Sequence, residues 1–451
     1  MNPYEAHVRY RLPPAVAFVV ALFDGVRTIG QIASNVARVF ACEREIAVQK
    51  VADVIERVSG TLLIPVGRAS SRWSRFCTPI ADVADLLYAP SDLPTPRARL
   101  PYNLAYVASR RCVRNCVYCY ANAGTRIPLE RDRMPLPRMR ALIEEAGQLG
   151  VSLISFSGGE PLMCPETIEL MLQALDEGVF PWVSTKALLT LSDAHKLGSA
   201  RLPIIQVSID SIDEGVQDWL CGIPGTLQDL KATILNAVDA GIGVYTNSVV
   251  TSANAAGIPE LVNWLLGNGV TSCLLTPYTH SLGRHSDALF PSRSDWQFLK
   301  SWEESIDPTE VQLRFTKGIA EEDASEEARD TAESNERPRS KCTAGREGFS
   351  FSWSGIATPC ERLASSGVEP AIVGNLKQQS IEEVWNSPEL HRLTLPRRSD
   401  CVGTVCESCV EFDDCLAERG RCMVRSWLAY DQLLGPDPLC KYAPPSNVRI
   451  F

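Results

Sequence analysis

The positions of the cysteines constrain this chain more than any other feature of its sequence. Sixteen cysteines occur among 451 residues, and eight of them lie between Cys342 and Cys440. Small disulfide-stapled scaffolds are far denser in cysteine, and in a reducing compartment clustered thiols bind metal more often than they form disulfides. The cysteine pattern therefore predicts metal centres.

Composition and charge exclude several classes of protein. The chain is 45% hydrophobic and 22% charged, which rules out a disordered or fibrous protein. Its net charge of -10 disfavours nucleic acid and anionic membranes as partners. No run approaches the roughly 20 apolar residues of a membrane span. The closest, Ala15 to Phe23, lacks a signal-peptide cleavage pattern, so we expect a buried helix and a cytoplasmic protein.

The apolar pattern of residues 1–75 predicts a small helical unit. An apolar helix follows two prolines at positions 13 and 14, a second begins near Thr28, and a third is expected from about Glu45 to Val58. A strand-like run, Thr61 to Val66, comes next. Three helices with a strand or hairpin indicate a winged-helix-like domain, and residues 76–100 read as a linker.

Residues 101–320 alternate short apolar runs with amphipathic helical segments. This alternation predicts an α/β fold of six strand-helix repeats, with a parallel sheet and right-handed crossovers. The expected strands are Leu104–Ser109, Val151–Ser157, Pro181–Thr185, Ile204–Asp210, Gly243–Val250 and Ser272–Thr276. The expected helices include Pro137–Leu149, Glu166–Leu175, Leu227–Ala240 and Glu260–Leu266. Residues that follow the strands should line one rim, where barrel active sites are built.

Two further segments complete the predicted organisation. Glu321 to Glu336 contains eight acidic residues, one arginine and no large apolar residue, which predicts a solvated acidic linker over residues 321–340. Residues 341–451 show little periodicity. We expect a cysteine-rich domain there that is organised around metal.

Three cysteines directly follow the first expected strand. Cys112, Cys116 and Cys119 are separated by three and two residues, so a tight loop can present three thiolates to one iron-sulfur cubane and leave one iron open. Arginines at positions 110, 111 and 114 favour the thiolate form. A zinc loop is the alternative, but it needs a fourth ligand, and none follows locally.

This motif, with Tyr118 before its last cysteine, resembles the cluster loop of the radical SAM superfamily. The resemblance implies a partial (β/α)6 TIM-type barrel in which the three cysteines hold a [4Fe-4S] cluster. S-adenosylmethionine would chelate the open iron, and its reduction would release methionine and a 5'-deoxyadenosyl radical.

The ends of the following strands also resemble that family. Gly158-Gly159-Glu160 is similar to its GGE motif, in which glycine admits the methionine end of the cofactor and the glutamate accepts from its ammonium. An ordinary strand-to-helix turn is the alternative for this motif, and a helix cap is the alternative for Asp210. The implied cofactor-binding residues are Tyr118, Ser157, Gly158, Gly159, Glu160, Ser184, Ser208 and Asp210.

The C-terminal cysteines are similar to the SPASM domain, which holds two auxiliary [4Fe-4S] clusters. The likeness assigns the outer cluster to Cys406, Cys409, Cys415 and Cys440, and the inner cluster to Cys342, Cys360 and Cys422. Six residues rather than the usual three separate Cys415 from Cys422, and Cys401 is an additional candidate. An open inner position would suit a substrate thiolate, whereas ligation by Cys401 would make that cluster an electron conduit. Zinc ribbons are the alternative.

Leu22 to Ala33 resembles the small chaperone-like domain of pyrroloquinoline quinone biosynthesis and the leader-recognition elements of peptide-modifying enzymes. Such domains bind an extended leader as an added strand beside a helix groove. The alternatives are a structural cap and a DNA-binding winged helix, and the acidic chain disfavours DNA.

The remaining cysteines and histidines carry weaker signals. His280 and His285 flank Gly283-Arg284 after the sixth expected strand and could line the cavity, but nothing identifies a catalytic acid or base. Cys221 is expected in the loop after the fourth strand. Five cysteines without ligand spacing are expected to be buried small hydrophobic residues: Cys42, Cys77, Cys164, Cys221 and Cys273.

Together the resemblances imply a radical SAM/SPASM maturase that crosslinks a ribosomally made precursor peptide through a thioether or carbon-carbon bond. Its cofactors would be S-adenosylmethionine and three [4Fe-4S] clusters. Its partners would be the precursor with its leader and an electron donor such as flavodoxin or ferredoxin, with no nucleic acid or membrane. The alternatives are a SPASM enzyme that oxidises a protein residue or a quinone-cofactor precursor, an RNA-modifying radical enzyme, and a zinc-bound peptide-binding adaptor.

Overall fold

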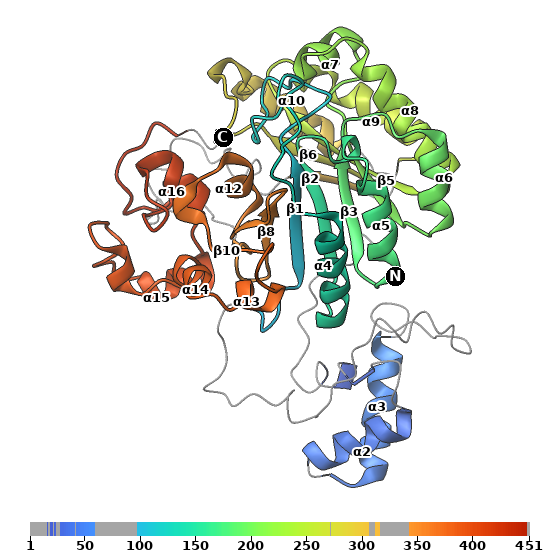
Figure 1. Ribbon diagram of the computed structural model, residues 1–451, viewed down its shortest axis with the longest axis vertical. Coiled ribbons are helices and arrows are strands. Elements are labelled where there is room, and N and C mark those ends of the chain that lie inside the picture. The colour runs from blue at the N-terminus through green and yellow to red at the C-terminus, as the bar shows by residue number, and fades with distance from the viewer. Residues whose placement is uncertain are drawn as a thin grey trace. The chain divides into compact units, whose positions relative to one another are not determined.

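The computed structural model describes residues 28–40, 42–58, 97–270, 272–305 and 342–448, a few positions between 16 and 23, and the backbone of 312–315. Residues up to Thr95 belong to one compact unit, and the sheet and the cysteine-rich region share a second (Figure 1). The predicted strand at 61–66, most of the first predicted helix, Cys77 and the acidic segment 321–340 lie outside the described residues.

The N-terminal unit contains two of the predicted helices, α2 (Ile29–Val39) and α3 (Arg44–Val58). A capping box begins α2, because the Thr28 side chain accepts from the Gln31 amide at 3.3 Å and the Gln31 side chain accepts from the Thr28 amide at 2.8 Å. The helices bury a shared apolar core of Val19, Leu22, Ile32, Ala33, Val36, Ala47, Val51 and Val54. This unit therefore has its own hydrophobic core.

Ten strands of the described residues form one sheet in the order β10-β9-β8-β1-β2-β3-β4-β5-β6-β7. Each of β1 to β7 is parallel to its neighbours in this run, which confirms the predicted α/β fold. The six predicted strands are β1 (Asn103–Ser109), β2 (Leu153–Gly158), β3 (Phe180–Thr185), β4 (Ile204–Ser208), β5 (Gly243–Val250) and β6 (Ser272–Pro277). A seventh strand, β7 (Gln312–Phe315), extends the run.

Helices connect these strands and cover one face of the sheet (Figure 1). They are α4 (Leu136–Leu149), α5 (Thr167–Asp176), α6 (Leu191–Ser199), α7 (Glu214–Cys221), α8 (Thr226–Asp239), α9 (Ile258–Gly267) and α10 (Arg293–Glu304), with short η5 (Pro161–Met163), η6 (Ala255–Gly257) and η7 (Asp287–Leu289). Along β5, Val244, Thr246 and Ser248 are buried, whereas Tyr245 and Asn247 between them are half-buried. The face of the sheet opposite the helices is therefore the open one.

The cysteine-rich region continues the same sheet. Its first strand, β8 (Gly348–Ser352), is parallel to β1, and β9 (Ile356–Thr358) and β10 (Gly374–Asn375) follow as antiparallel strands. A Cβ on Gly348 would lie 1.9 Å from the Asn103 carbonyl oxygen, so only glycine permits this close approach. The later helices are α12 (Glu361–Ser366), η8 (Glu369–Ala371), α13 (Ile381–Trp385), α14 (Pro388–Thr394), η9 (Arg398–Cys401), α15 (Phe412–Asp414), η10 (Cys415–Arg419) and α16 (Met423–Tyr430).

Residues 97–100, predicted as the end of a linker, pack against the cysteine-rich region. Arg97 donates from Nε to the Gly345 carbonyl at 2.9 Å, and its guanidinium lies 3.8 Å above the Trp385 ring. The Trp385 indole donates to the Arg99 carbonyl at 3.0 Å. These contacts fix the chain where it enters β1.

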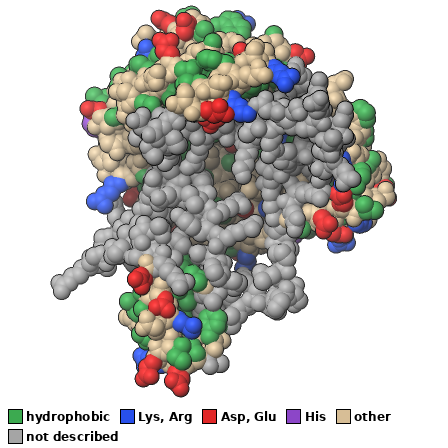
Figure 2. All heavy atoms as spheres, turned by 180° about the vertical axis from the view of Figure 1, so that it is seen from behind, with side chains coloured by type: hydrophobic (Ala, Val, Ile, Leu, Met, Phe, Trp, Pro, Cys, Tyr) green, Lys and Arg blue, Asp and Glu red, His purple; other side chains and the backbone are tan. Residues whose placement is uncertain are grey.

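The surface carries both signs of charge, as expected for a chain in which 22% of residues are charged. Figure 2 shows acidic, basic and hydrophobic side chains interspersed over the part of the surface that is coloured. Within the ranges given above, no helix has both the length and the apolar character needed to cross a membrane.

Candidate active site

The three cysteines after β1 lie on a loop that closes on itself. The Cys112 amide donates to the Gly124 carbonyl, and the Gly124 amide donates to the Arg110 carbonyl, each at 3.2 Å. Two sulfurs accept backbone hydrogen bonds, from the Arg114 amide to Cys112 Sγ at 3.4 Å and from the Ala123 amide to Cys119 Sγ at 3.3 Å. Amides directed at thiolate sulfurs tune iron-sulfur clusters, so this loop fits such a group.

The GGE motif lies directly against this loop. The Gly159 amide donates to the Ser109 carbonyl at 2.6 Å, and the Glu160 amide donates to the Arg111 carbonyl at 3.0 Å. Gly158 has a φ of 112°, and a Cβ on Gly159 would lie 2.1 Å from the Arg111 carbonyl oxygen. Both glycines are therefore required for the end of β2 to meet the cluster loop.

Glu160 is a buried carboxylate at the ends of β2 and β3. Its Oε1 accepts from the Thr185 hydroxyl at 2.7 Å and the Leu162 amide at 3.1 Å, and its Oε2 accepts from the Lys186 amide at 2.9 Å. Burial raises the pKa of Glu160, although these donors oppose the shift. The side chain is thus held in one orientation, which suits a partner that carries an ammonium group.

Lys186 joins the cluster loop to the sheet; the stretch Ser184-Thr185-Lys186 was expected near the cofactor, but the sequence assigned Lys186 no role of its own. Its Nζ donates to Asp210 Oδ2 at 2.6 Å and to the Tyr118 hydroxyl at 2.9 Å, and the Tyr118 hydroxyl also donates to Asp210. Burial is the largest single effect and lowers the pKa of Lys186, but the Asp210 carboxylate and the neighbouring Cys221 and Cys116 thiols together raise it more, and the net shift is upward. Asp210 does not cap α7, because Asp213 is the N-cap. The signal available was the position of Lys186 directly after the third strand.

The open face of the sheet carries polar side chains beside the predicted Ser184 and Ser208. Their hydroxyl oxygens are 3.4 Å apart, and Gln206 Nε2 donates to Ser184 Oγ at 2.7 Å. Thr276 Oγ1 donates to Asn247 Oδ1 at 2.8 Å on the neighbouring strands. Gln206, Asn247 and Thr276 were missed, although each alternates along its strand with a buried residue. Ser157, by contrast, is buried, 3.5 Å from the Tyr106 carbonyl oxygen.

Arg284, on the loop between β6 and η7, holds the cluster loop from a second side. Its amide donates to the Cys119 carbonyl at 2.9 Å, its Nη1 donates to the Cys116 carbonyl at 2.7 Å, and its Nη2 donates to the Ala123 carbonyl. A Cβ on Gly283 would lie 2.0 Å from the Cys119 carbonyl oxygen. The flanking histidines were predicted as residues that could line the cavity, whereas Arg284 had no predicted role.

The position predicted for Cys221 is wrong. It is the last residue of α7, not part of a loop, because Asp213 caps the start of a short helix and Gly222, with a φ of 66°, ends it. Its buried thiol accepts from Gln217 Nε2 at 3.0 Å, and its proximity raises the pKa of Cys116. Cys164 and Cys273 are buried as predicted, and Cys42 is half-buried.

The structure separates the C-terminal cysteines into two groups. A small pocket is lined by Cys406, Cys409, Cys415 and Cys440, the set assigned to the outer cluster, together with Arg421. Burial raises the pKa of Cys360, and the neighbouring thiols of Cys422 and Cys342, the other members of the inner set, raise it further. Cys401 is buried. Burial raises the pKa of Cys406, a member of the outer set, and the nearby Cys401 thiol raises it further.

Known families match two parts of the chain. Residues 106–265 match the radical SAM superfamily, and residues 342–410 match an iron-sulfur cluster-binding domain, SPASM. The first match contains the cluster loop, the GGE motif and Lys186. The second contains the first five C-terminal cysteines, and Cys415, Cys422 and Cys440 lie beyond it.

Curated relatives and solved structures agree with these matches. The PqqA peptide cyclase of Gluconobacter oxydans is 26% identical over 360 residues, which are 78% of this chain and 92% of that protein. The AdoMet-dependent heme synthase of Methanosarcina barkeri is 26% identical over 357 residues, which are 76% of this chain and 97% of that protein.

The fold is similar to that of Streptococcus suis SuiB bound to the precursor peptide SuiA, with a TM-score of 0.65 and 18% identity over 96% of this chain and 94% of SuiB. It is also similar to anSMEcpe with bound AdoMet, with a TM-score of 0.52 and 18% identity over 76% and 95% of the two chains. The cluster loop and the GGE motif lie within the first family match, and five of the C-terminal cysteines lie within the second. The chain is a radical SAM enzyme with a C-terminal SPASM iron-sulfur domain.

Proposed function

We propose that this enzyme matures a ribosomally made precursor peptide by forming a thioether or carbon-carbon crosslink within it. The observation that carries the proposal is the pocket lined by Cys406, Cys409, Cys415 and Cys440, in addition to the thiols of the cluster loop. Crosslinking removes two hydrogen atoms from the peptide and is an oxidation. One electron must leave as the new bond forms, and an auxiliary cluster would supply an acceptor separate from the cluster that reduces S-adenosylmethionine.

The proposed reaction balances with these parts. With a cluster held by Cys112, Cys116 and Cys119, S-adenosylmethionine would supply a 5'-deoxyadenosyl radical able to remove one hydrogen atom from a peptide carbon. Bond formation from that carbon to a second side chain then releases one proton and one electron. The proton passes to solvent or a base, and the electron passes to an auxiliary cluster.

The residues around the cluster loop would either contact the cofactor or hold the loop in position. Glu160 is oriented to accept from the cofactor ammonium, and Ser184 and Ser208 face the open side of the sheet, where a cofactor and a peptide would lie. That Tyr118 and Asp210 contact the cofactor directly stays a prediction. Their hydrogen bonds with Lys186 favour a positioning role, in which they hold the cluster loop against β3 and β4.

Coexpression tests the proposed function. We expect a short peptide encoded beside this gene to lose two hydrogen atoms in mass when it is produced together with the enzyme. An unchanged mass would contradict the proposal. Iron and acid-labile sulfide analysis tests the alternative of a zinc-bound adaptor, because three cubanes require about 12 irons per chain.

The N-terminal unit is proposed to recognise the leader of the precursor. Helices α2 and α3 have a core of their own, and Ile29, Ile46 and Val48 expose apolar surface that could pack against a peptide. Deletion of residues 1–75 is expected to weaken precursor binding at least about tenfold while peptide-independent cleavage of S-adenosylmethionine continues. Fluorescence anisotropy of a labelled precursor and chromatography of 5'-deoxyadenosine measure the two effects. Equal affinity with and without the unit would contradict leader recognition.

A basic surface pocket beside the cluster loop fits an acidic electron donor. Arg110, Arg126 and Arg284 line a pocket of about 510 Å³ with Asn115 and Asn122, on a chain whose net charge is -10. The Nε of Arg110 is buried and has no hydrogen-bond partner among the residues described. We propose that flavodoxin or ferredoxin docks here, where local positive charge offsets the repulsion from the rest of the chain.

Charge reversal of the exposed Arg126 tests this docking site. Arg126→Glu is expected to slow 5'-deoxyadenosine formation about tenfold with flavodoxin at low salt, and the effect should shrink as ionic strength rises. With dithionite as the reductant the variant should match the unchanged enzyme. Arg392→Glu, a reversal on the exposed face of α14, is the matched control. An equal loss with dithionite would show that Arg126 does not act through the carrier.

A further inference from the structure

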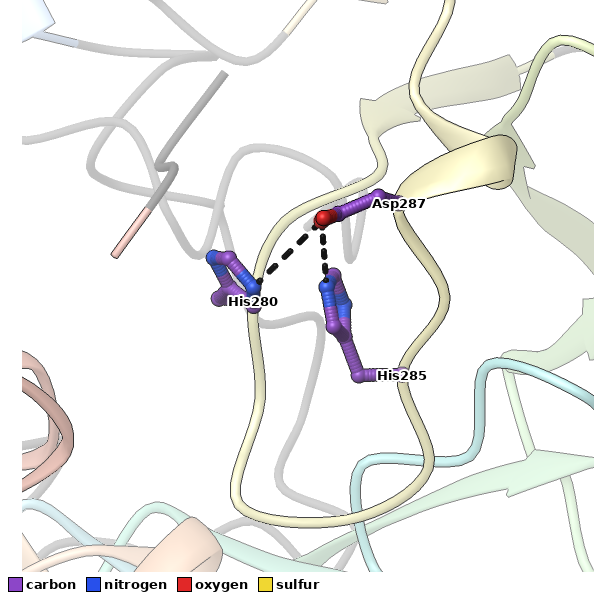
Figure 3. A group of neighbouring side chains, drawn as sticks. All are labelled: His280, His285 and Asp287. Atoms are coloured by element: carbon purple, nitrogen blue, oxygen red, sulfur yellow. Dashed lines mark hydrogen bonds and ion pairs between the residues drawn. The ribbon is translucent and has the colours of Figure 1, made fainter. Parts of the chain in front are cut away.

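Two of the five histidines of the chain lie together on the loop between β6 and η7. Figure 3 shows the side chains of His280 and His285 directed at the carboxylate of Asp287. Asp287 Oδ1 lies 2.9 Å from His285 Nε2 and 3.8 Å from His280 Nε2, and the ligand atoms of the three residues lie within 4.8 Å of one another. Three potential metal ligands therefore converge from eight consecutive residues.

These separations suit a single metal ion. At zinc-ligand distances of about 2.0–2.2 Å, nitrogen and oxygen ligands of one ion lie about 3–4 Å apart. Small side-chain rotations would bring the triad into that range, because its ligand atoms already lie within 4.8 Å of one another. The donor set of two imidazoles and one carboxylate is typical of zinc and other late divalent transition metals.

A second layer of contacts holds the His285 ring in its orientation. Its Nδ1 lies 2.6 Å from the hydroxyl of the buried Tyr278, which also accepts from the Ser286 amide at 2.9 Å. The two rings stack with an interplanar angle of 2°. When Nδ1 donates to Tyr278, Nε2 is left with its lone pair toward Asp287, which is the arrangement that metal-bound histidines adopt.

The triad is separate from the sulfur ligands, and its chemistry differs from theirs. The side chain of Asp287 is 73% exposed, so an ion held here would keep positions open to water. The loop also carries Arg284, whose hydrogen bonds hold the carbonyl groups of Cys116 and Cys119. An ion that ties residue 280 to residues 285 and 287 would stiffen the segment that supports the cluster loop.

We propose that His280, His285 and Asp287 bind one divalent transition-metal ion, with Zn²⁺ the best fit, and that the ion fixes the loop between β6 and η7. The site is additional to the iron-sulfur clusters and does not depend on which peptide the enzyme modifies. Its ligands are nitrogen and oxygen atoms on a single loop, whereas the iron-sulfur clusters use cysteine sulfur. The zinc content of the protein therefore reports on this site, and the iron content reports on the clusters.

Zinc binding to the reconstituted full-length enzyme tests the proposal. After equilibrium dialysis against micromolar ZnCl₂ in excess Mg²⁺, elemental analysis should find one zinc per chain in the unchanged enzyme. The variants His280→Ala and Asp287→Asn should bind zinc at least about tenfold more weakly. Iron content should be the same in every sample. His195→Ala is the matched control, because His195 also faces a carboxylate, Asp239, at 3.2 Å on an exposed surface. If both triad variants retain as much zinc as the unchanged enzyme, or if the unchanged enzyme binds none, the proposal is wrong.

Discussion

Alanine at any one of Cys112, Cys116 and Cys119 is expected to abolish reductive formation of 5'-deoxyadenosine. All three thiols belong to one loop, and hydrogen bonds within the loop and from Arg284 hold it in place. Each substitution removes one of three ligands and leaves an iron without its thiolate, so the cluster should be lost or unable to reduce S-adenosylmethionine. We expect activity to fall at least about a thousandfold, to the detection limit, because the group that performs the chemistry is missing.

Chromatography of 5'-deoxyadenosine from dithionite-reduced, reconstituted enzyme measures this loss. Cys273→Ala is the matched control, since Cys273 is a buried cysteine of β6 outside the ligand sets and should keep both iron and activity. Iron content should fall by about four per chain in the loop variants alone. A triple variant that still forms 5'-deoxyadenosine would refute the assignment of the loop.

Substitution in the outer cysteine group should instead separate the two halves of the reaction. Cys409→Ala is expected to stop peptide crosslinking while 5'-deoxyadenosine formation continues without a crosslinked product. Cys409 lines the outer pocket and lies within the SPASM match, residues 342–410, so its substitution leaves the cluster loop and Glu160 in place. What disappears is the acceptor for the electron released when the bond forms.

Peptide mass and 5'-deoxyadenosine are measured in the same reactions for this variant. The expected result is a ratio of crosslink to 5'-deoxyadenosine at least about tenfold below that of the unchanged enzyme. Cys164→Ala, a buried cysteine outside the SPASM domain, serves as the control. If Cys409→Ala crosslinks the peptide normally, the outer group is not the electron outlet.

The parallel run of the sheet was predictable because its signals are local. Each of the six predicted strands is a short apolar run, and α8 and α9 follow from periodic apolar positions, so the structure confirms them within a few residues. The pairing of β8 with β1 was not predictable, because it joins residues more than 240 positions apart. Its one sequence signal, Gly348 where a Cβ would meet the Asn103 carbonyl oxygen, has meaning only once the register is known.

The candidate site was predictable where the chemistry requires a fixed spacing. The cluster-loop cysteines and the GGE motif are such cases, and the structure places the motif against Ser109 and Arg111, at the start of the loop that carries the cysteines. Lys186 and Arg284 act through partners that are 24 to 168 residues away in sequence, so no local pattern identified them. Cys221 was misplaced because α7 has only eight residues, too few for a clear period.

Hydrogen transfer from the peptide tests the central claim most directly. The reduced enzyme is given S-adenosylmethionine and a precursor peptide in which every carbon-bound hydrogen is deuterium, and the 5'-deoxyadenosine is analysed by mass spectrometry. Our account predicts that one deuterium enters 5'-deoxyadenosine for each peptide molecule that is crosslinked. Unlabelled 5'-deoxyadenosine alongside a modified peptide would contradict it.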